Sequence, residues 1–439
     1  METIDLTSTL ESTKAMGTAE RGISSMASKL VGSEILKIAA EVRARIAQGD
    51  SILNLTVGDF SSREFPVPEQ LSTGITKALA AGHTNYPPSS GVLELRESVR
   101  DMFERRLGLK YPVESVLIAG GARPMIAGSY LALIDPGDEV VYGAPSWNNN
   151  HYCTLTGAKG VEVPTTVETS FFPTVEQIEA HLSTARLLCL NTPQNPTGTV
   201  MPKDQLEHIA RRVVDENERR KSDGRPLLYL MFDQVYWLLV FDGVEHATPV
   251  NLVPEVAPYT IFVDGISKGF AGTGLRVGWA LGPQDIISRM SAILTHLGAW
   301  APRPEQIATK ALLDDDRAID QHLTLMRSEV LTRLKLLDEA VSSLREKGWN
   351  VESVAPQGAI YLSMRLDLRG KKTPDGVTIE TDEQTRKYLL EAAGVALVPF
   401  TCFGVREDTG WFRASVGAVS KADCESIKGR LSTALDRLS

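Results

Sequence analysis

Short, almost uninterrupted apolar runs recur along the middle of the chain and alternate with segments of helical periodicity. The runs predict strands over 113–120, 138–143, 186–191, 227–233, 259–265 and 277–282, and the residues after the first run predict a helix over 122–134. A strand without polar alternation has both faces buried, which is typical of a mostly parallel sheet covered by helices on each side. The pattern therefore predicts a layered α/β domain.

The segments on either side of this region predict a flexible N-terminal arm and a second, smaller domain. Residues 1–30 are rich in Ser, Thr and Gly, and residues 31–62 begin with helical spacing and are expected to pack with the smaller domain. The large domain is predicted over 63–320. A long amphipathic segment then leads into a small domain over 321–439, in which the polar stretch 368–382 reads as a surface insertion.

Length and charge narrow the class of protein. With 439 residues the chain exceeds what one hydrophobic core usually serves, so more than one domain is expected. A net charge of −9 argues against a nucleic-acid partner. The four cysteines form no CxxC pair, the N-terminus lacks the apolar core of a signal peptide, and no run is long enough for a membrane helix. We therefore expect a cytoplasmic protein with reduced thiols, without a metal site and without a membrane partner.

Six short motifs follow one another in a fixed order along the chain. They are Gly121-Ala122-Arg123-Pro124, Pro145-Ser146-Trp147, Asn195-Pro196-Thr197-Gly198, Asp233-Gln234-Val235-Tyr236, Ser267-Lys268 with Arg276, and Trp411-Phe412-Arg413. Each has an ordinary reading when taken alone, because a lysine after a strand is usually a solvated cation and an isolated tryptophan usually packs in a core. Together, from about residue 30 to the C-terminus, they resemble the fold type I, class I/II aminotransferases, and the aspartate aminotransferases among them.

The resemblance implies both a fold and an activity. The fold is α/β: a three-layer large domain of the pyridoxal-phosphate transferase kind, with a mostly parallel mixed sheet, plus a smaller α+β domain. The activity is that of a transaminase that uses pyridoxal 5′-phosphate. It would move an amino group from an L-amino acid, aspartate or glutamate, to a 2-oxo acid by a ping-pong mechanism.

Five residues are implied to surround the cofactor ring. Lys268 matches the amine that condenses with the cofactor aldehyde and later acts as a general base. Asp233 matches the carboxylate that keeps the pyridine nitrogen protonated, because a nearby negative charge favours the charged form. Asn195 and Tyr236 match the groups that hydrogen-bond the phenolic oxygen of the ring, and Trp147 matches the aromatic side chain that stacks on its face.

The phosphate of the cofactor is implied to lie at the start of the helix predicted over 122–134. Gly121 precedes the backbone amides of Ala122 and Arg123, and free N–H groups at a helix N-terminus favour an anion. Arg276 and Ser267 match further phosphate contacts. The chain departs from the family pattern at Gly265, because many relatives carry a serine there that contacts the phosphate.

The resemblance also implies substrate contacts. Arg413 matches the arginine that binds the substrate α-carboxylate, and planar bidentate pairing suits arginine better than lysine. Gly58 matches a glycine that lets the substrate approach the backbone, and Trp147 and Asn195 border the same space. Arg123 could bind the second carboxylate of a dicarboxylic substrate; alternatively, its side chain faces solvent and only its N–H matters.

Tyr86 lies in a block that resembles the segment whose tyrosine reaches the phosphate of the neighbouring subunit, which implies a homodimer with a shared active site. Three alternatives remain beside the aspartate or glutamate transaminase. The enzyme could act on aromatic or neutral amino acids, or it could be a pyridoxal-dependent lyase or cyclopropane-forming synthase on the same fold. A transcription regulator would need a DNA-binding domain ahead of the fold, and the N-terminal arm is expected to be too short for one.

Overall fold

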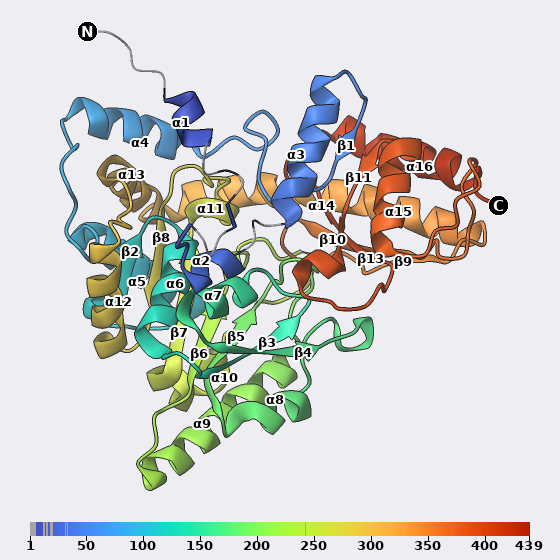
Figure 1. The fold of residues 1–439 in the computed structure, drawn as a ribbon. Coiled ribbons are helices and arrows are strands. Elements are labelled where there is room, and N and C mark those ends of the chain that lie inside the picture. The colour runs from blue at the N-terminus through green and yellow to red at the C-terminus, as the bar shows by residue number, and fades with distance from the viewer. Residues whose placement is uncertain are drawn as a thin grey trace.

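A large seven-stranded sheet and a smaller four-stranded sheet organise the chain, and they lie in different halves of the molecule (Figure 1). The computed structural model describes residues 6–11, 14, 16–17, 21–30, 32, 34–241 and 243–439. Within the predicted arm, two short helices are described, α1 (Thr7–Glu11) and α2 (Ser25–Lys29). Residues 1–5, 12–13, 15 and 18–20 of that arm lie outside the described residues.

The large sheet has the strand order β2-β8-β7-β6-β5-β3-β4. Its strands are β2 (Val116–Ala119), β3 (Glu139–Ala144), β4 (Lys159–Pro164), β5 (Ala185–Asn191), β6 (Tyr229–Asp233), β7 (Thr260–Gly265) and β8 (Gly278–Leu281). The strand β8 runs antiparallel to β2 and β7 and the other pairs are parallel, which confirms the mostly parallel mixed sheet. The edge strand β4 escapes prediction because the sequence KGVEVP has no continuous apolar run, and 113–115 forms a 3-10 turn in place of the predicted strand start.

Helices cover both faces of the large sheet, as the uninterrupted apolar strands predict. In β6, Met231 packs with α6 (Ala122–Leu133) and α12 (Gln284–His296), whereas its neighbour Phe232 packs with the helices of the opposite face. The remaining helices of this half are α4 (Glu69–Ala80), α5 (Leu93–Leu107), α7 (Asn149–Thr156), α8 (Val175–Leu182), α9 (Lys203–Asp223), α10 (Pro249–Leu252), α11 (Ile266–Gly269) and α13 (Arg303–Leu313). The result is a three-layer α/β arrangement.

The smaller sheet is antiparallel, with the order β12-β13-β10-β9. It consists of β9 (Val351–Ser353), β10 (Tyr361–Leu366), β12 (Val398–Pro399) and β13 (Trp411–Ser415), and the separate pair β1 (Leu53–Asn54) and β11 (Val395–Ala396) is parallel. Three helices accompany these strands: α3 (Glu34–Ala47), α15 (Asp382–Tyr388) and α16 (Lys421–Leu435). Residues of β1 share a hydrophobic core with β10 and α16, so the segment after α3 packs with this sheet.

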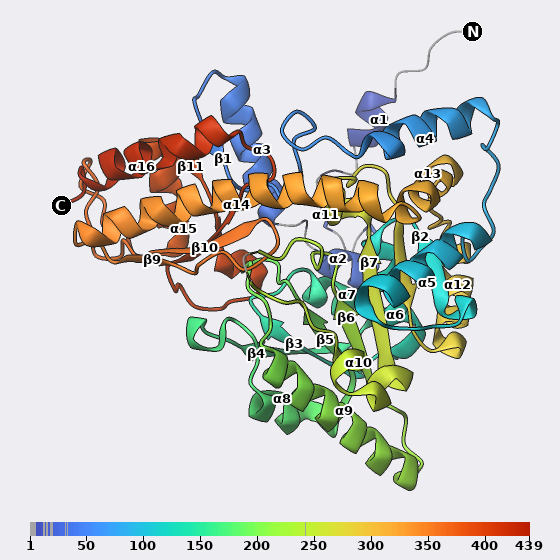
Figure 2. The ribbon, with the colours of Figure 1, turned by 180° about the vertical axis from the view of Figure 1, so that it is seen from behind.

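A single long helix, α14 (Asp316–Glu346), joins the two halves and crosses the side of the molecule that faces the viewer in Figure 2. Its first turns place Ile319 and Leu323 in the core of the large sheet. From Met326 onward its buried residues belong to the core of the small sheet. The transition between the two cores therefore falls within one helix, a few residues after position 320.

The prediction of a surface insertion at 368–382 is wrong at both ends of that segment. Leu368, Ile379 and Asp382 are buried, while most of the residues between them are exposed. Single apolar residues within a polar stretch give no periodic signal, and their burial depends on where the surrounding strands bring them.

All four cysteines are free thiols. None of the helices in the described part of the chain has the length and apolar character needed to span a membrane.

Candidate active site

A cavity of about 410 Å³ opens where β5 and β6 end, the edge at which parallel sheets usually bind ligands. The large sheet contributes Asn191 and Asp233 from the ends of these strands, and Lys268 comes from α11, directly after β7. The small sheet contributes Arg413 from β13. Because residues from both halves line the cavity, its shape depends on how the two cores meet.

Lys268 places its amine inside this cavity. Lys268 Nζ donates a hydrogen bond to the backbone oxygen of Gly58 at 2.6 Å. Burial lowers the pKa of this amine to about 8, the carboxylate of Asp59 acts in the opposite direction, and nearby arginines led by Arg413 lower it further. The amine is therefore easily deprotonated, and a neutral amine is what a nucleophile or general base requires.

Asp233 lies at the C-terminal end of β6 in the same cavity. Its Oδ1 accepts a hydrogen bond from the backbone N–H of Val235 at 3.1 Å. Burial raises the pKa of this carboxyl to about 6, while the charge of Lys268 acts to lower it. A carboxylate in this position would stabilise a positive charge on a group bound in the cavity.

Arg413 is 2% exposed and is held by two acceptors. Its Nη1 donates to Oδ1 of Asn195 at 3.0 Å, and its Nη2 donates to the backbone oxygen of Thr56 at 2.7 Å. Its Nε is buried without a hydrogen-bond partner. A buried guanidinium with an unused donor can bind an additional anion, and a carboxylate matches its planar geometry.

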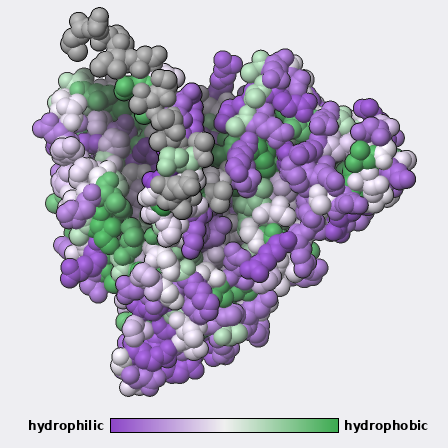
Figure 3. Space-filling model, in the orientation of Figure 1, coloured by the Kyte–Doolittle hydropathy of each residue, from purple (hydrophilic) through white to green (hydrophobic). Residues whose placement is uncertain are grey.

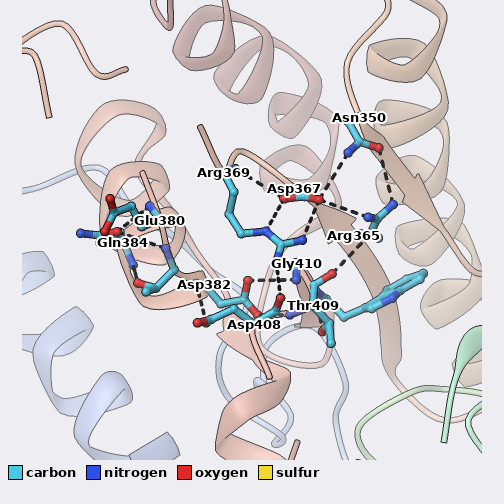
Figure 4. A network of polar contacts seen from close by, with 12 residues as sticks. Asn350, Arg365, Asp367, Arg369, Glu380, Asp382, Gln384, Asp408, Thr409 and Gly410 are labelled. Atoms are coloured by element: carbon cyan, nitrogen blue, oxygen red, sulfur yellow. Dashed lines mark hydrogen bonds and ion pairs between the residues drawn. The ribbon is translucent and has the colours of Figure 1, made fainter. Parts of the chain in front are cut away.

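A polar network fixes the loop that leads into the strand of Arg413 (Figure 4). The buried carboxylate of Asp382 accepts hydrogen bonds from the backbone N–H groups of Thr409, at 3.0 Å, and Gly410, at 2.9 Å. Burial raises the pKa of Asp382 to about 6. Arg369 donates to Asp367 at 2.7 Å in the same network. These contacts hold the chain immediately before β13, so the network is part of the scaffold of Arg413.

The N-terminus of α6 and Arg276 form a cradle of hydrogen-bond donors. Arg276 donates from Nη1 to Thr273 O at 2.7 Å and from Nη2 to Gly120 O at 2.8 Å. Gly121 has a φ of +97°, which favours glycine, and a Cβ at this position would lie 2.3 Å from Arg276 Nη2. Free backbone N–H groups at a helix start together with a guanidinium favour an anion.

The departure at Gly265 has a packing cause. A Cβ at this position would lie 2.8 Å from both Gly278 Cα and Val277 O. Real side chains essentially never approach backbone so closely, so the serine that the family resemblance implies at this position does not fit between β7 and β8. Ser267, two residues later, borders the cavity in its place.

Arg123 and Trp147 form a stacked pair at another wall of the cavity. The Cζ of Arg123 lies 4.4 Å from the centre of the Trp147 ring. A guanidinium that stacks by its face keeps its N–H edges available for a carboxylate. The side chain of Arg123 thus borders the cavity.

Residues 50–431 match the family described as aminotransferase class I and II. The chain belongs to this aminotransferase family. An aspartate aminotransferase of Rhizobium meliloti is 31% identical over 413 residues, covering 93% of this chain and 94% of that protein. An aspartate/prephenate aminotransferase of Thermus thermophilus is 31% identical over 385 residues, covering 87% and 92%.

The solved structures agree with the class I and II assignment. The crystal structure of the aspartate aminotransferase from Rhizobium meliloti has a TM-score of 0.85 and 28% identity, and the match covers 95% of this chain and 99% of that one. This confirms the predicted fold class. The Thermus thermophilus aspartate aminotransferase with maleate has a TM-score of 0.83 and 29% identity, covering 94% of this chain and 100% of that one.

Most of the residues predicted for the aminotransferase site line the one cavity. They are Gly58, Ala122, Arg123, Trp147, Asn195, Asp233, Tyr236, Ser267, Lys268, Arg276 and Arg413. Gly121 lies beside them, against Arg276. Tyr86 does not border the cavity of its own chain; it is 81% exposed and its ring lies 5.1 Å from that of Trp300.

Sequence reasoning missed several polar residues of the cavity, among them Asp59, Thr273 and Tyr361. Asp59 and Thr273 are neighbours of predicted residues in the chain, and the oxygen Oγ1 of Thr273 donates to Oδ1 of Asp59 at 2.5 Å. Tyr361 lies in an apolar strand segment whose pattern indicates only a core position. No sequence signal brings it to the cavity.

Class I and II aminotransferases typically use pyridoxal 5′-phosphate, and the residues present fit that group. The buried amine of Lys268 suits an aldehyde, and the carboxylate of Asp233 suits a protonated ring nitrogen. The donors at the start of α6 and Arg276 suit a phosphate. The unpartnered Nε of Arg413 leaves a separate donor for a substrate carboxylate.

Proposed function

We propose that this protein is a pyridoxal 5′-phosphate-dependent transaminase that moves the amino group of aspartate or glutamate to a 2-oxo acid by a ping-pong mechanism. The observation that carries the proposal is the meeting of a buried amine, Lys268, with a buried acid, Asp233, and three arginines in one cavity. A family likeness alone would leave the chemistry open, because the same scaffold serves several reactions.

The bound group would supply an aldehyde that takes up the amino group and a ring that draws electron density from the substrate. Lys268 Nζ would hold the group and then move the proton of the substrate Cα. Its pKa of about 8 supports this role, since the amine is readily neutral. Asp233 would keep the ring nitrogen protonated, and Tyr236 and Asn195 would hydrogen-bond the phenolic oxygen. Trp147 would stack on the ring.

The anion contacts divide into two sets. The backbone of Gly121, Ala122 and Arg123, with Ser267 and Arg276, would hold the phosphate of the cofactor. Arg413 would bind the α-carboxylate of the substrate, with its unpartnered Nε as support for that role. Gly58 would border the substrate through its backbone.

A dicarboxylic substrate is supported by the position of Arg123. Its guanidinium lies over the Trp147 ring and borders the cavity. The relatives in Rhizobium meliloti and Thermus thermophilus are named as aspartate and aspartate/prephenate aminotransferases, which supports an acidic substrate. We therefore propose Arg123 as the group that binds the second carboxylate.

A panel of amino donors with 2-oxoglutarate or oxaloacetate tests the proposed reaction. We expect stoichiometric formation of a 2-oxo acid from aspartate or glutamate, dependent on the acceptor and lost in Lys268→Ala. Ammonia release without an acceptor would indicate the lyase alternative instead. Faster turnover of aromatic or neutral donors would indicate the alternative transaminase specificity.

Arg123→Ala should raise KM for aspartate and glutamate by roughly a factor of ten to a hundred, because a charge-assisted hydrogen bond to the substrate is worth about 1.5–3 kcal/mol. KM for alanine or phenylalanine should change far less. Arg345→Ala, an exposed arginine at the end of α14, serves as the matched control and should change neither constant. Equal effects of Arg123→Ala on acidic and neutral donors would contradict the assignment.

We also propose a homodimer in which Tyr86 reaches the phosphate site of the partner. The exposure of Tyr86 supports this, and so do the exposed side chains of Leu93 and Leu297. Hydrophobic surface also gathers in Figure 3 on the side of the molecule formed by α6 and α12. Sedimentation equilibrium of the purified protein tests the assembly.

We further propose that the chain divides into the segments 1–30, 31–62, 63–320 and 321–439. The change from the larger to the smaller core along α14 supports the boundary between 63–320 and 321–439.

A further inference from the structure

We propose that Tyr361 is a positioning residue of this site: its hydroxyl donates to Tyr236 and so directs the Tyr236 proton toward the phenolic oxygen of the cofactor. The inference rests on the proposed function, in which Tyr236 faces that oxygen. Nothing in the motifs points to Tyr361, which comes from β10 of the small sheet, whereas Tyr236 follows β6 of the large one.

The two hydroxyl groups form a buried pair. Tyr236 Oη and Tyr361 Oη lie 2.5 Å apart, and the rings meet edge to face with centroids 5.5 Å apart. Tyr361 is 1% exposed and Tyr236 is 2% exposed, and both residues line the cavity. At this distance one hydroxyl donates and the other accepts. Because each phenol has one proton, the direction of the bond decides which hydroxyl can donate to a third group.

The surrounding charge favours Tyr361 as the donor. The Cζ of Arg413 lies 4.8 Å from the centre of the Tyr361 ring, and a cation over a phenol ring makes its hydroxyl a better donor. The amine of Lys268 lies 5.6 Å from the Tyr236 ring. Burial lowers the pKa of that amine to about 8, so it loses its charge much more easily than the guanidinium does. Tyr361 therefore gives its proton to the bond, and Tyr236 keeps its own proton free.

The backbone around Tyr361 leaves its hydroxyl little freedom. A Cβ on Gly198 would lie 2.1 Å from Tyr361 O, and a Cβ on Gly58 would lie 2.7 Å from Tyr361 Oη. Two residues along β10, Ser363 Oγ donates to Thr197 O at 2.8 Å. Because Gly58 and Gly198 have no side chain, their backbone packs directly against Tyr361, and the hydrogen bond of Ser363 fixes the strand at this distance. The hydroxyl pair is thus built into the contact between the two halves of the molecule.

Donation from Tyr361 strengthens the donor on Tyr236, because hydrogen bonds in a chain polarise one another. A stronger donor stabilises the negative charge on the phenolic oxygen of the bound cofactor. That stabilisation lowers the pH at which the visible absorption band of the bound cofactor changes. Loss of the Tyr361 hydroxyl should therefore move this midpoint upward.

The experiment is a pH titration of the visible band in the cofactor-loaded protein without substrate. We expect Tyr361→Phe to raise the midpoint by roughly one pH unit, which is a tenfold change in the proton equilibrium. Tyr388→Phe is the matched control: Tyr388 is buried in the same half, its hydroxyl donates to Ala434 O at 2.7 Å, and it does not border the cavity. This control should leave the midpoint unchanged.

A double-mutant cycle separates positioning from general loosening of the fold. If Tyr361 acts through Tyr236, adding Tyr361→Phe to Tyr236→Phe should leave the midpoint where Tyr236→Phe alone puts it. An unchanged or lowered midpoint in Tyr361→Phe, or an equal upward shift in both backgrounds, would overturn the inference. These outcomes leave the proposed function standing, whereas a wild-type protein that takes up no cofactor would refute the proposed function itself.

Discussion

At the scale of single residues, the site depends on how charges are arranged around one amine. Burial, and to a smaller extent three arginines, lower the pKa of Lys268, and Asp59 is the carboxylate that opposes them. Asp59 Oδ1 also accepts hydrogen bonds from Thr273 Oγ1 and from the backbone N–H of Phe60, at 2.5 and 2.8 Å. Asp59 is thereby held beside the amine, and its charge sets how readily Lys268 becomes neutral.

Asp59→Asn should move the pH dependence of cofactor uptake. In the cofactor-free protein, the rate of uptake should rise as the pH passes through about 8, because only the neutral amine of Lys268 attacks an aldehyde. Since Asp59 raises the pKa of Lys268, its replacement should shift the curve to lower pH, by roughly one unit. Asp215→Asn, on the exposed side of α9, should leave the curve unchanged. A shift of the Asp59→Asn curve to higher pH would contradict this account.

At the scale of elements, close contact between backbones decides which side chains fit at the start of α6 and at the end of β7. Gly265 and Gly278 face each other in the pairing of β7 with β8. A Cβ on Gly278 would lie 2.4 Å from the carbonyl carbon of Gly121. Three glycines therefore bring two strands and a helix N-terminus together, and the cradle for an anion forms at that point.

Gly265→Ser should destabilise the protein by about 1–3 kcal/mol, because the new side chain must push two strands apart. The free energy of unfolding, measured in urea by circular dichroism, checks this expectation. Gly274→Ser provides the comparison, since a Cβ at Gly274 meets nothing within 4 Å and should change stability little. Equal stability of the two variants would mean that β7 and β8 tolerate a wider spacing.

At the scale of the whole molecule, two cores are joined by α14 and share one cavity. Beside the larger core lies a half-buried histidine, His246, whose ring lies 5.9 Å from that of Phe232 and 6.0 Å from that of Trp237. Its Nε2 lies 3.3 Å from Gln234 Oε1, and its Nδ1 is buried without a hydrogen-bond partner. Burial lowers the pKa of His246 to about 3, because the charged ring would lose its hydration.

This histidine makes global stability sensitive to acid. The unfolded chain binds a proton at His246 below about pH 6.5, whereas the folded chain resists protonation down to about pH 3, so stability is lost as the pH falls between these values. Between pH 7 and pH 5 the free energy of unfolding should fall by about 2 kcal/mol less in His246→Gln than in the wild type. Urea unfolding at both pH values measures the difference. If the free energy of unfolding depends on pH identically in the variant and the wild type, the folded protein does not keep His246 uncharged, and this account is wrong.

Much of this protein follows from local sequence alone. Continuous apolar runs are enough to predict strands buried on both faces, and the run LLYLMFD becomes β6 with Asp233 at its end. Motifs such as Ser267-Lys268 lie at ends of strands, where parallel strands bring their residues to one edge of the sheet. The predicted site residues therefore needed little tertiary information to be recognised as a group.

Other features were decided only by the tertiary structure. Tyr361 and Asp59 have ordinary local sequences, and their roles come from neighbours far along the chain: Tyr236 is 125 residues from Tyr361, and Thr273 is 214 residues from Asp59. A local pattern reports which face of an element is buried. It does not report which distant hydroxyl, cation or backbone carbonyl that face will meet, because that depends on how the two cores pack against each other.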